Sequence, residues 1–129
     1  MRLLIDTNVL VPLTLGEPSQ LRDDERAAVQ SSDTQAVVSV ASLWEIAIKV
    51  RLGKLAVGLP LDELPAYFLS IGFEELLVDR YHVLAKLQPE AATRDPFDCL
   101  LLAQCQVENM RLVTRDRALA AHPLAWRPA

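Results

Sequence analysis

Short runs of apolar residues alternate with helical patterns along the whole chain, and this alternation leaves few folds open to it. We predict strands at residues 2–6, 36–40, 73–78 and 111–114, and a fifth, short strand is compatible with 124–126. The predicted helices cover residues 9–13, 19–30, 42–53, 61–71, 79–87 and 95–109, with a short one after 116. Continuous apolar strands separated by helices are typical of parallel sheets covered on both faces. The sequence therefore predicts an α/β fold, a three-layer α/β/α domain with a central parallel sheet of four to five strands.

The length and composition indicate one domain spanning residues 1–129. Of its residues 51% are hydrophobic, which is enough to fill a core without disulfide or metal staples. No apolar run approaches the roughly 18 residues of a membrane span, and Asp6 interrupts the first one. Cys99 and Cys105 fall in one predicted helix, about 9 Å apart along its axis, too far for a disulfide. We therefore expect a cytoplasmic protein with reduced thiols and no membrane contact.

Four acidic residues are predicted to meet at one edge of the sheet. Asp6 ends the first predicted strand, and Asp116 follows the fourth. Glu45 is predicted in the first turn of the helix that follows the second strand, and Asp98 in the first turn of the helix that begins at Asp95. The carboxyl ends of parallel strands meet at one edge, and side chains in a first helical turn lean back toward it. Carboxylate clusters of this kind favour Mg²⁺ or Mn²⁺. The sequence therefore predicts a divalent-metal site at this edge.

The overall charge is compatible with such a site. Seventeen acidic residues against thirteen basic ones give a net charge of −4, which argues against binding nucleic acid by bulk positive charge. With these four acids set aside, the acids number thirteen, the same as the bases. The acidic excess could therefore sit in one site that divalent cations neutralise.

Helix capping offers a competing explanation for two of these acids. Ser42 and Glu45 have the spacing of a capping box, and Lys49 lies one turn beyond Glu45, where it can form an ion pair. Asp95, Pro96 and Asp98 likewise form a helix-start pattern, in which we assign Asp95 to capping and Asp98 to metal. From spacing alone, both roles remain open for Glu45.

Four motifs together resemble the PIN-domain nucleases, particularly the VapC-like toxins of bacterial toxin–antitoxin pairs. The motifs are LIDTNVL at 4–10, SLWEIAIK at 42–49 followed by LGKL at 52–55, RDPFD at 94–98 and LVTRD at 112–116. They occur in the family's order and cover essentially the whole chain. Two positions depart from this subgroup's third motif, because Thr93 replaces a histidine and Cys99 replaces an arginine.

The resemblance implies a metal-dependent endoribonuclease that acts as a toxin. Its catalytic and metal-binding residues match Asp6, Glu45, Asp98 and Asp116, which would hold one or two Mg²⁺ or Mn²⁺ ions. It would hydrolyse RNA by a water molecule that the metal activates. The resemblance also implies a cognate antitoxin and a homodimer.

Several other residues have candidate roles around these motifs. Hydrogen bonds from Thr7, Asn8 or Thr114 could orient the acids, although as plain helix caps they are equally credible. His82 and His122 are not expected to bind metal, because no second histidine or cysteine is spaced to join either. We interpret Trp44 as a core or subunit contact in preference to a base-stacking residue. Six basic residues that flank the motifs are ordinary solvated charges or phosphate contacts: Lys49, Arg51, Lys54, Arg94, Arg115 and Arg117.

Two non-enzymatic alternatives remain at this level. One is a receiver-like switch domain in which Asp6 and a neighbour hold Mg²⁺, but Thr7 and Asn8 stand where such domains carry a second acid. The other is a PIN fold kept only for protein binding, against which the intact set of acids argues.

Overall fold

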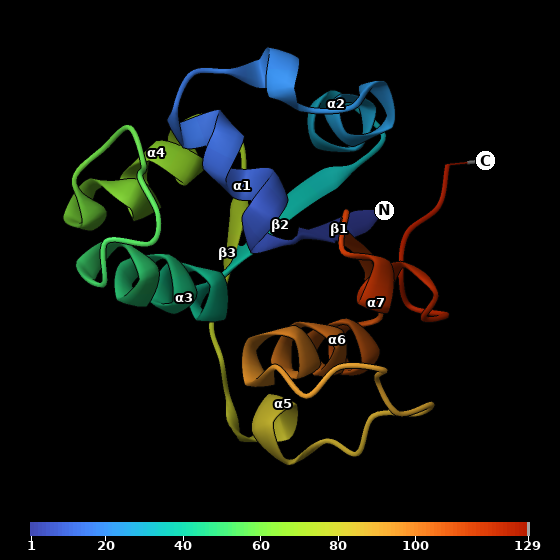
Figure 1. Ribbon diagram of the computed structural model, residues 1–129. Helices are drawn as coiled ribbons and strands as arrows, with labels where there is room; N and C mark the ends of the chain where they lie inside the picture. The colour runs from blue at the N-terminus through green and yellow to red at the C-terminus, as the bar shows by residue number, and fades with distance from the viewer. Residues whose placement is uncertain (129) are drawn as a thin grey trace.

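A four-stranded parallel sheet forms the centre of the computed structural model, which describes residues 1–128 (Figure 1). The strands are β1 (Arg2–Ile5), β2 (Gln35–Ser39), β3 (Glu74–Leu76) and β4 (Arg111–Val113), in the order β3-β2-β1-β4. Every pairing is parallel. The segment predicted as a fifth strand contributes a single bridge, between Leu112 and Ala125. The prediction of a parallel sheet of four to five strands is confirmed, with four strands formed.

Helices cover both faces of this sheet. They are α1 (Thr7–Thr14), α2 (Asp23–Gln30), α3 (Val40–Arg51), α4 (Leu64–Ser70), α5 (Arg80–Leu84), α6 (Pro96–Glu108) and α7 (Arg117–Ala120), with 3₁₀ turns at Pro18–Gln20 and Leu61–Glu63. In Figure 1, α1, α2 and α4 lie on one side of the strands, and α5 and α6 lie on the other.

Two separate apolar clusters fill the space between the layers, because side chains alternate along a strand. Leu3 and Ile5 of β1 pack in the cluster beneath α1, α2 and α4, which includes Phe68. Leu4 points the other way and packs in a cluster with residues of α6 and α7, including Leu102. The three-layer α/β/α architecture is therefore present as predicted.

Two helices, α1 and α3, begin with caps other than the ones predicted. α1 begins at Thr7 with Asp6 as its N-cap, whereas we expected Thr7 or Asn8 to cap it. α3 begins at Val40, and the N-cap is Ser39, whose hydroxyl accepts from the Ala41 N–H at 3.0 Å. In both cases the last polar residue of the strand caps the next helix, so no loop separates the two elements.

Two other helix starts agree with the prediction, and the start of α2 does not. α6 begins at Pro96 with Asp95 as its N-cap, and Asp79 caps α5, both as predicted. α2 begins only at Asp23, because Ser19 belongs to a separate 3₁₀ turn.

The topology excludes the receiver-like alternative. In that fold the first strand lies between the second and the third, whereas here β1 lies between β2 and β4. Cys99 and Cys105 are both free thiols on α6, as expected. Within residues 1–128 no helix has the length and apolar content needed to cross a membrane.

Candidate metal centre

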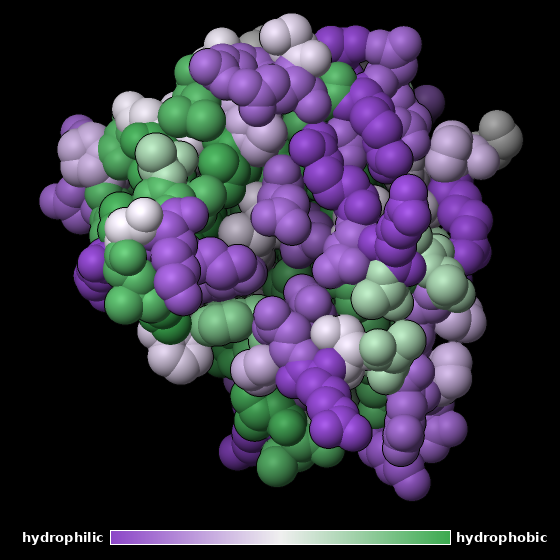
Figure 2. All heavy atoms as spheres, in the orientation of Figure 1, coloured by the Kyte–Doolittle hydropathy of each residue, from purple (hydrophilic) through white to green (hydrophobic). Residues whose placement is uncertain are grey.

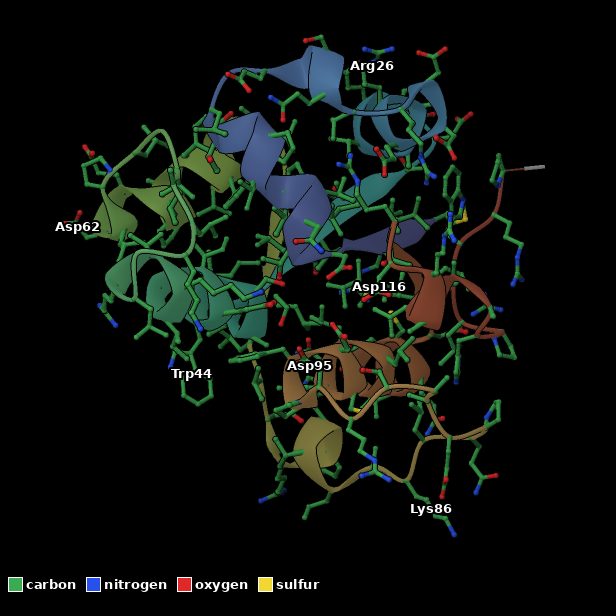
Figure 3. The ribbon with its side chains drawn as sticks, in the orientation of Figure 1. Arg26, Trp44, Asp62, Lys86, Asp95 and Asp116 are labelled. Atoms are coloured by element: carbon green, nitrogen blue, oxygen red, sulfur yellow. The ribbon has the colours of Figure 1, made fainter. Side chains whose placement is uncertain are left out.

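The four predicted acids come together at the carboxyl edge of the sheet. Asp6 follows β1 and Asp116 follows β4, and each caps the helix that begins there. Figure 3 shows Asp95 and Asp116 on the same side of the molecule, at the starts of α6 and α7. Burial raises the pKa of Asp98, and the charges of Asp95, Asp6, Asp116 and Glu45 raise it further, so these acids lie near enough to one another to interact. Within residues 1–128, no three of the four predicted acids offer ligand atoms that all lie within 4.8 Å of one another. Their joint role as metal ligands therefore stays a prediction.

Asp6 is the most rigidly held of the four. It is 3% exposed, and its two carboxylate oxygens accept separate hydrogen bonds, from the Thr7 N–H and from the Thr114 hydroxyl, each at 2.8 Å. The Thr114 hydroxyl also accepts from the Asp116 N–H at 3.1 Å, so it joins the first and fourth motifs. Burial raises the pKa of Asp6, which these hydrogen bonds only partly offset.

Glu45 lies in the second turn of α3 and is 6% exposed. Its Oε1 accepts from the Thr7 hydroxyl at 2.7 Å, and its Oε2 accepts from the Lys49 ammonium at 2.6 Å. The predicted capping box with Ser42 is wrong, since the helix begins two residues earlier and the buried Ser42 hydroxyl has no partner in the described chain. The predicted ion pair with Lys49 is present.

The pKa of Asp98 is strongly raised. Burial and the charges of Asp95 and the other carboxylates raise its pKa to about 7. Asp95 caps α6 through the Phe97 N–H at 2.8 Å, as predicted. Thr93, which replaces the family's histidine, donates a long hydrogen bond of 3.5 Å to Asp98 and accepts one from the Asp95 N–H at 3.1 Å. The departure at Thr93 therefore keeps a polar contact to this acid.

The set of donors fits a divalent cation. All four side chains offer carboxylate oxygens, and Asp6 and Glu45 are almost fully buried. Burial and the negative charges around it raise the pKa of Asp98, so a cation bound there would favour its ionised form. Mg²⁺ is commonly held by one or two carboxylates, with water and phosphate oxygens completing its octahedron. Thr7 and Thr114 orient two of the acids, as we predicted, whereas Asn8 is exposed.

Sequence reasoning missed one charged residue behind this edge. Glu25 of α2 is 0% exposed and accepts two hydrogen bonds from the Arg115 guanidinium, at 2.6 and 3.1 Å. Arg115 is therefore held in an ion pair with Glu25, beside Asp116. The sequence had made it a candidate phosphate contact. In the sequence nothing distinguishes Glu25 from its neighbours, the exposed Asp23 and the half-buried Asp24.

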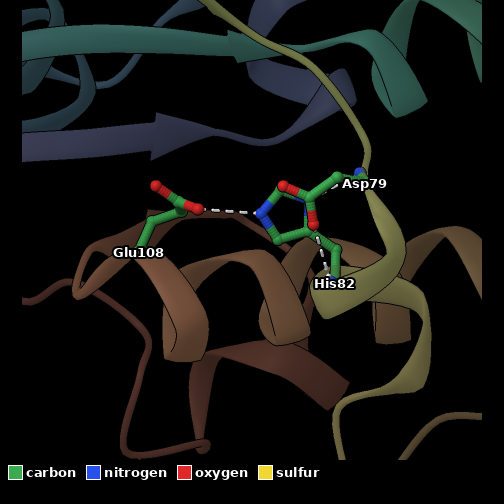
Figure 4. A group of neighbouring side chains, drawn as sticks. All are labelled: Asp79, His82 and Glu108. Carbon is green, nitrogen blue, oxygen red and sulfur yellow. Dashed lines mark hydrogen bonds and ion pairs between the residues drawn. The ribbon is translucent and has the colours of Figure 1, made fainter.

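A second group of potential ligands lies between α5 and α6. Asp79, His82 and Glu108 form the one cluster within residues 1–128 whose ligand atoms all fall within 4.8 Å of one another. Figure 4 shows the imidazole of His82 between the two carboxylates. His82 Nδ1 accepts from the Asp79 N–H at 3.0 Å, and Nε2 lies 2.9 Å from a Glu108 oxygen. Because both ring nitrogens have partners, we interpret His82 as a tie between these helices.

His122 and Trp44 lie in different surroundings, one buried and one exposed. His122 is buried, with Nε2 against the Pro89 carbonyl at 2.8 Å and Nδ1 accepting from the Leu124 N–H at 3.1 Å, so both its nitrogens are also engaged. Trp44 is 61% exposed, which rules out a core position. Its ring meets the edge of Phe97 with centroids 5.5 Å apart, beside the acids of α3 and α6.

The fold and this edge define a class of protein, namely three-layer α/β domains with a carboxylate-lined site at the ends of their parallel strands. The chain belongs to the PIN-domain family, whose model matches residues 3–123.

Two solved structures share the fold over almost the whole chain. A toxin–antitoxin complex from Klebsiella pneumoniae is 21% identical with a TM-score of 0.63, and the match covers 98% of this chain and 97% of that one. VapBC2 from Rickettsia felis, bound to a DNA fragment from its promoter, is 17% identical with a TM-score of 0.64, covering 97% and 96%. No curated protein matches this chain significantly.

Proposed function

We propose that this protein is a divalent-metal-dependent endoribonuclease and the toxin of a toxin–antitoxin pair. The observation that carries the proposal is the convergence of Asp6, Glu45, Asp98 and Asp116, with Asp98 held at a pKa of about 7. Four carboxylates at one edge raise the free energy of the folded chain unless a cation binds there. The four motifs and the structural likeness to toxin–antitoxin complexes support RNA as the substrate.

The residues of the chain divide the work of hydrolysis. Asp6, Asp98 and Asp116 bind Mg²⁺ or Mn²⁺, with Glu45 as a further carboxylate of the set, and Thr7 and Thr114 hold two of these acids in place. The ion, when bound, would supply positive charge at the scissile phosphate and lower the pKa of the attacking water. Asp98 must lose its proton for the ion to bind, so affinity should rise with pH through 7.

Cleavage of RNA by the purified chain tests this function. We expect cleavage of a single-stranded RNA with Mg²⁺ or Mn²⁺ and none with EDTA. Asp6→Asn should slow cleavage at least about 100-fold, since altering even an indirect metal-site partner costs 10- to 100-fold. Asp62→Asn is the matched control, because Asp62 is an exposed acid remote from this edge (Figure 3). RNA cleavage that persists in EDTA, or in Asp6→Asn at the wild-type rate, would sink the proposal.

We further propose a cognate antitoxin and a homodimer as partners, with the cytoplasm as the place of action. Large apolar side chains are exposed on α3 and just after it, before α5 and on α5 itself, and Figure 2 shows hydrophobic residues over α5. They are Trp44, Leu52, Leu77, Tyr81, Val83 and Leu84. The apolar residues of α1 do not belong to this exposed set, because most of them are buried in the core. Exposed apolar groups of this kind mark partner surfaces.

The mass of the purified chain in solution tests the dimer. Light scattering should give about twice 14.3 kDa, and a monomer at all concentrations would contradict the dimer.

A further inference from the structure

Lys49 places a positive charge inside the acidic edge. Its side chain extends from α3, one turn beyond Glu45, and its ammonium donates to Glu45 Oε2 at 2.6 Å. The hydrogen bond to Glu45 raises the pKa of Lys49, and the charges of Asp95 and Asp98 raise it further. The ammonium therefore lies within the field of acids from α3 and α6, whereas Arg115 is engaged elsewhere.

Glu45 is already supplied with donors on both oxygens. Its Oε1 accepts from Thr7, and its Oε2 accepts from Lys49. Both oxygens of Asp6 also accept hydrogen bonds, but from the neutral donors Thr7 and Thr114, whereas one donor on Glu45 is a cation. A carboxylate whose charge is already matched by an ammonium attracts a second divalent ion less strongly. The Lys49 ammonium therefore occupies the oxygen of Glu45 that a second ion would use.

The charges lead to the same conclusion. The four predicted ligands and the neighbouring Asp95 carry −5 when ionised, and one divalent ion with the Lys49 ammonium supplies +3. A second divalent ion would have to lie beside both the first ion and the ammonium, and like charges repel strongly in a partly buried site. The ammonium supplies positive charge there without a second ion.

We propose that the Lys49 ammonium is the second cation of this site, so that the centre binds a single divalent ion and Lys49 contacts a phosphate oxygen of the RNA. The proposal rests on the proposed nuclease function. A lysine ammonium is a compact point charge that suits a phosphate oxygen. Lys49 then acts as a catalytic residue, since it touches the group on which cleavage occurs.

The number of Mn²⁺ ions bound per chain tests this role without reference to activity. Calorimetric titration at pH 8 should give one ion for the wild type. Lys49→Met removes the charge and keeps the side-chain length. This variant should bind two ions, because the carboxylate of Glu45 is then no longer paired with an ammonium. Lys49→Gln provides a second neutral variant, and Lys49→Arg should bind one ion. Lys86→Met is the matched control, since Lys86 is exposed and far from Asp116 (Figure 3).

The outcomes separate this inference from the nuclease proposal. Two ions in the wild type, or one ion in both neutral variants, would overturn the role of Lys49 and leave the nuclease proposal standing. No Mn²⁺ binding at all would overturn both. As a second readout, the neutral variants should lose about 100-fold in kcat, the loss typical of removing one charge-stabilising donor, and Lys49→Arg should recover part of it. Unchanged kcat in both neutral variants would also contradict the proposal.

Discussion

Replacing Asp98 with asparagine is expected to stabilise the protein in EDTA at pH 8 and to slow RNA cleavage at least about 100-fold. Burial and neighbouring carboxylates raise the pKa of Asp98 from 3.8 to about 7, so its ionised form is disfavoured in the folded chain. Each pKa unit corresponds to about 1.4 kcal/mol, but Asp98 is only half-buried and solvent screens its charge. We therefore expect a gain of about 1–2 kcal/mol, or roughly 4–8 °C in Tm.

The pH dependence of this gain follows from the sign of the shift. Because the folded pKa is raised, the contribution of the Asp98 carboxyl to wild-type stability is present below pH 4 and is lost as the pH rises through 7. The difference in Tm between Asp98→Asn and the wild type should be small at pH 4, grow between pH 4 and 7, and level off above. Thermal melts in EDTA across this range measure it.

The activity of the same variant completes the prediction. At pH 8 with Mn²⁺, Asp98→Asn should cleave RNA at least about 100-fold more slowly than the wild type, although it is the more stable protein. Asp62→Asn should change neither Tm nor cleavage beyond error. A lower Tm for Asp98→Asn at pH 8, or wild-type cleavage, would show that Asp98 is not a strained ligand of the site.

The second large effect is expected at Glu25. Its carboxylate is fully buried and accepts from the Arg115 guanidinium and from the Arg22 N–H at 2.8 Å. Removing one partner of a buried ion pair leaves the other charge unpaired in the interior. This lowers the free energy of unfolding by about 3–5 kcal/mol. Since the Arg115 side chain is 33% exposed and can reach water, we expect Glu25→Gln to cost about 3 kcal/mol, measured by urea denaturation at pH 7.

The pH dependence of this second effect has the opposite sign. Burial alone would raise the pKa of Glu25, but the hydrogen bonds and charges of Arg115 and Arg22 outweigh it and lower that pKa below 4.5. The stability that this group contributes is therefore present above pH 4.5 and is lost as the pH falls through the lowered value. The cost of Glu25→Gln should accordingly shrink in acid.

An exposed ion pair in the same chain provides the control. Arg2 and Glu74 make two hydrogen bonds of 3.0 Å, and both side chains are substantially exposed. Glu74→Gln should cost less than about 1 kcal/mol, as surface pairs do. Equal costs for Glu25→Gln and Glu74→Gln would contradict the importance that we give to burial.

The parts of this fold that local sequence determines were predictable. The continuous apolar runs around Leu4, Val37 and Leu112 identify parallel strands, because strands covered by helices on both faces are apolar throughout. Asp95 and Pro96 fix the start of α6 by cap chemistry and by the dihedral of proline. With the strands placed, the convergence of the acids follows from the parallel topology.

The parts that depend on contacts between distant segments were not predictable. Ser39 at the end of β2 and Asp6 directly after β1 each cap a helix, and the sequence alone offered Ser42 and Thr7 as equally good caps. Glu25 is buried only because Arg115, ninety residues away, meets it. The exposure of Trp44 depends likewise on how α3 packs beside α6.

Anomalous diffraction from crystals soaked in Mn²⁺ tests most directly whether these four carboxylates form a cation site. We predict one peak at the carboxyl edge of the sheet, about 2.0–2.2 Å from oxygens of Asp6 and Asp98 and bounded by Asp116, the distance range of hard divalent ions. A peak found only between Asp79, His82 and Glu108, or no peak at the sheet edge, would contradict it.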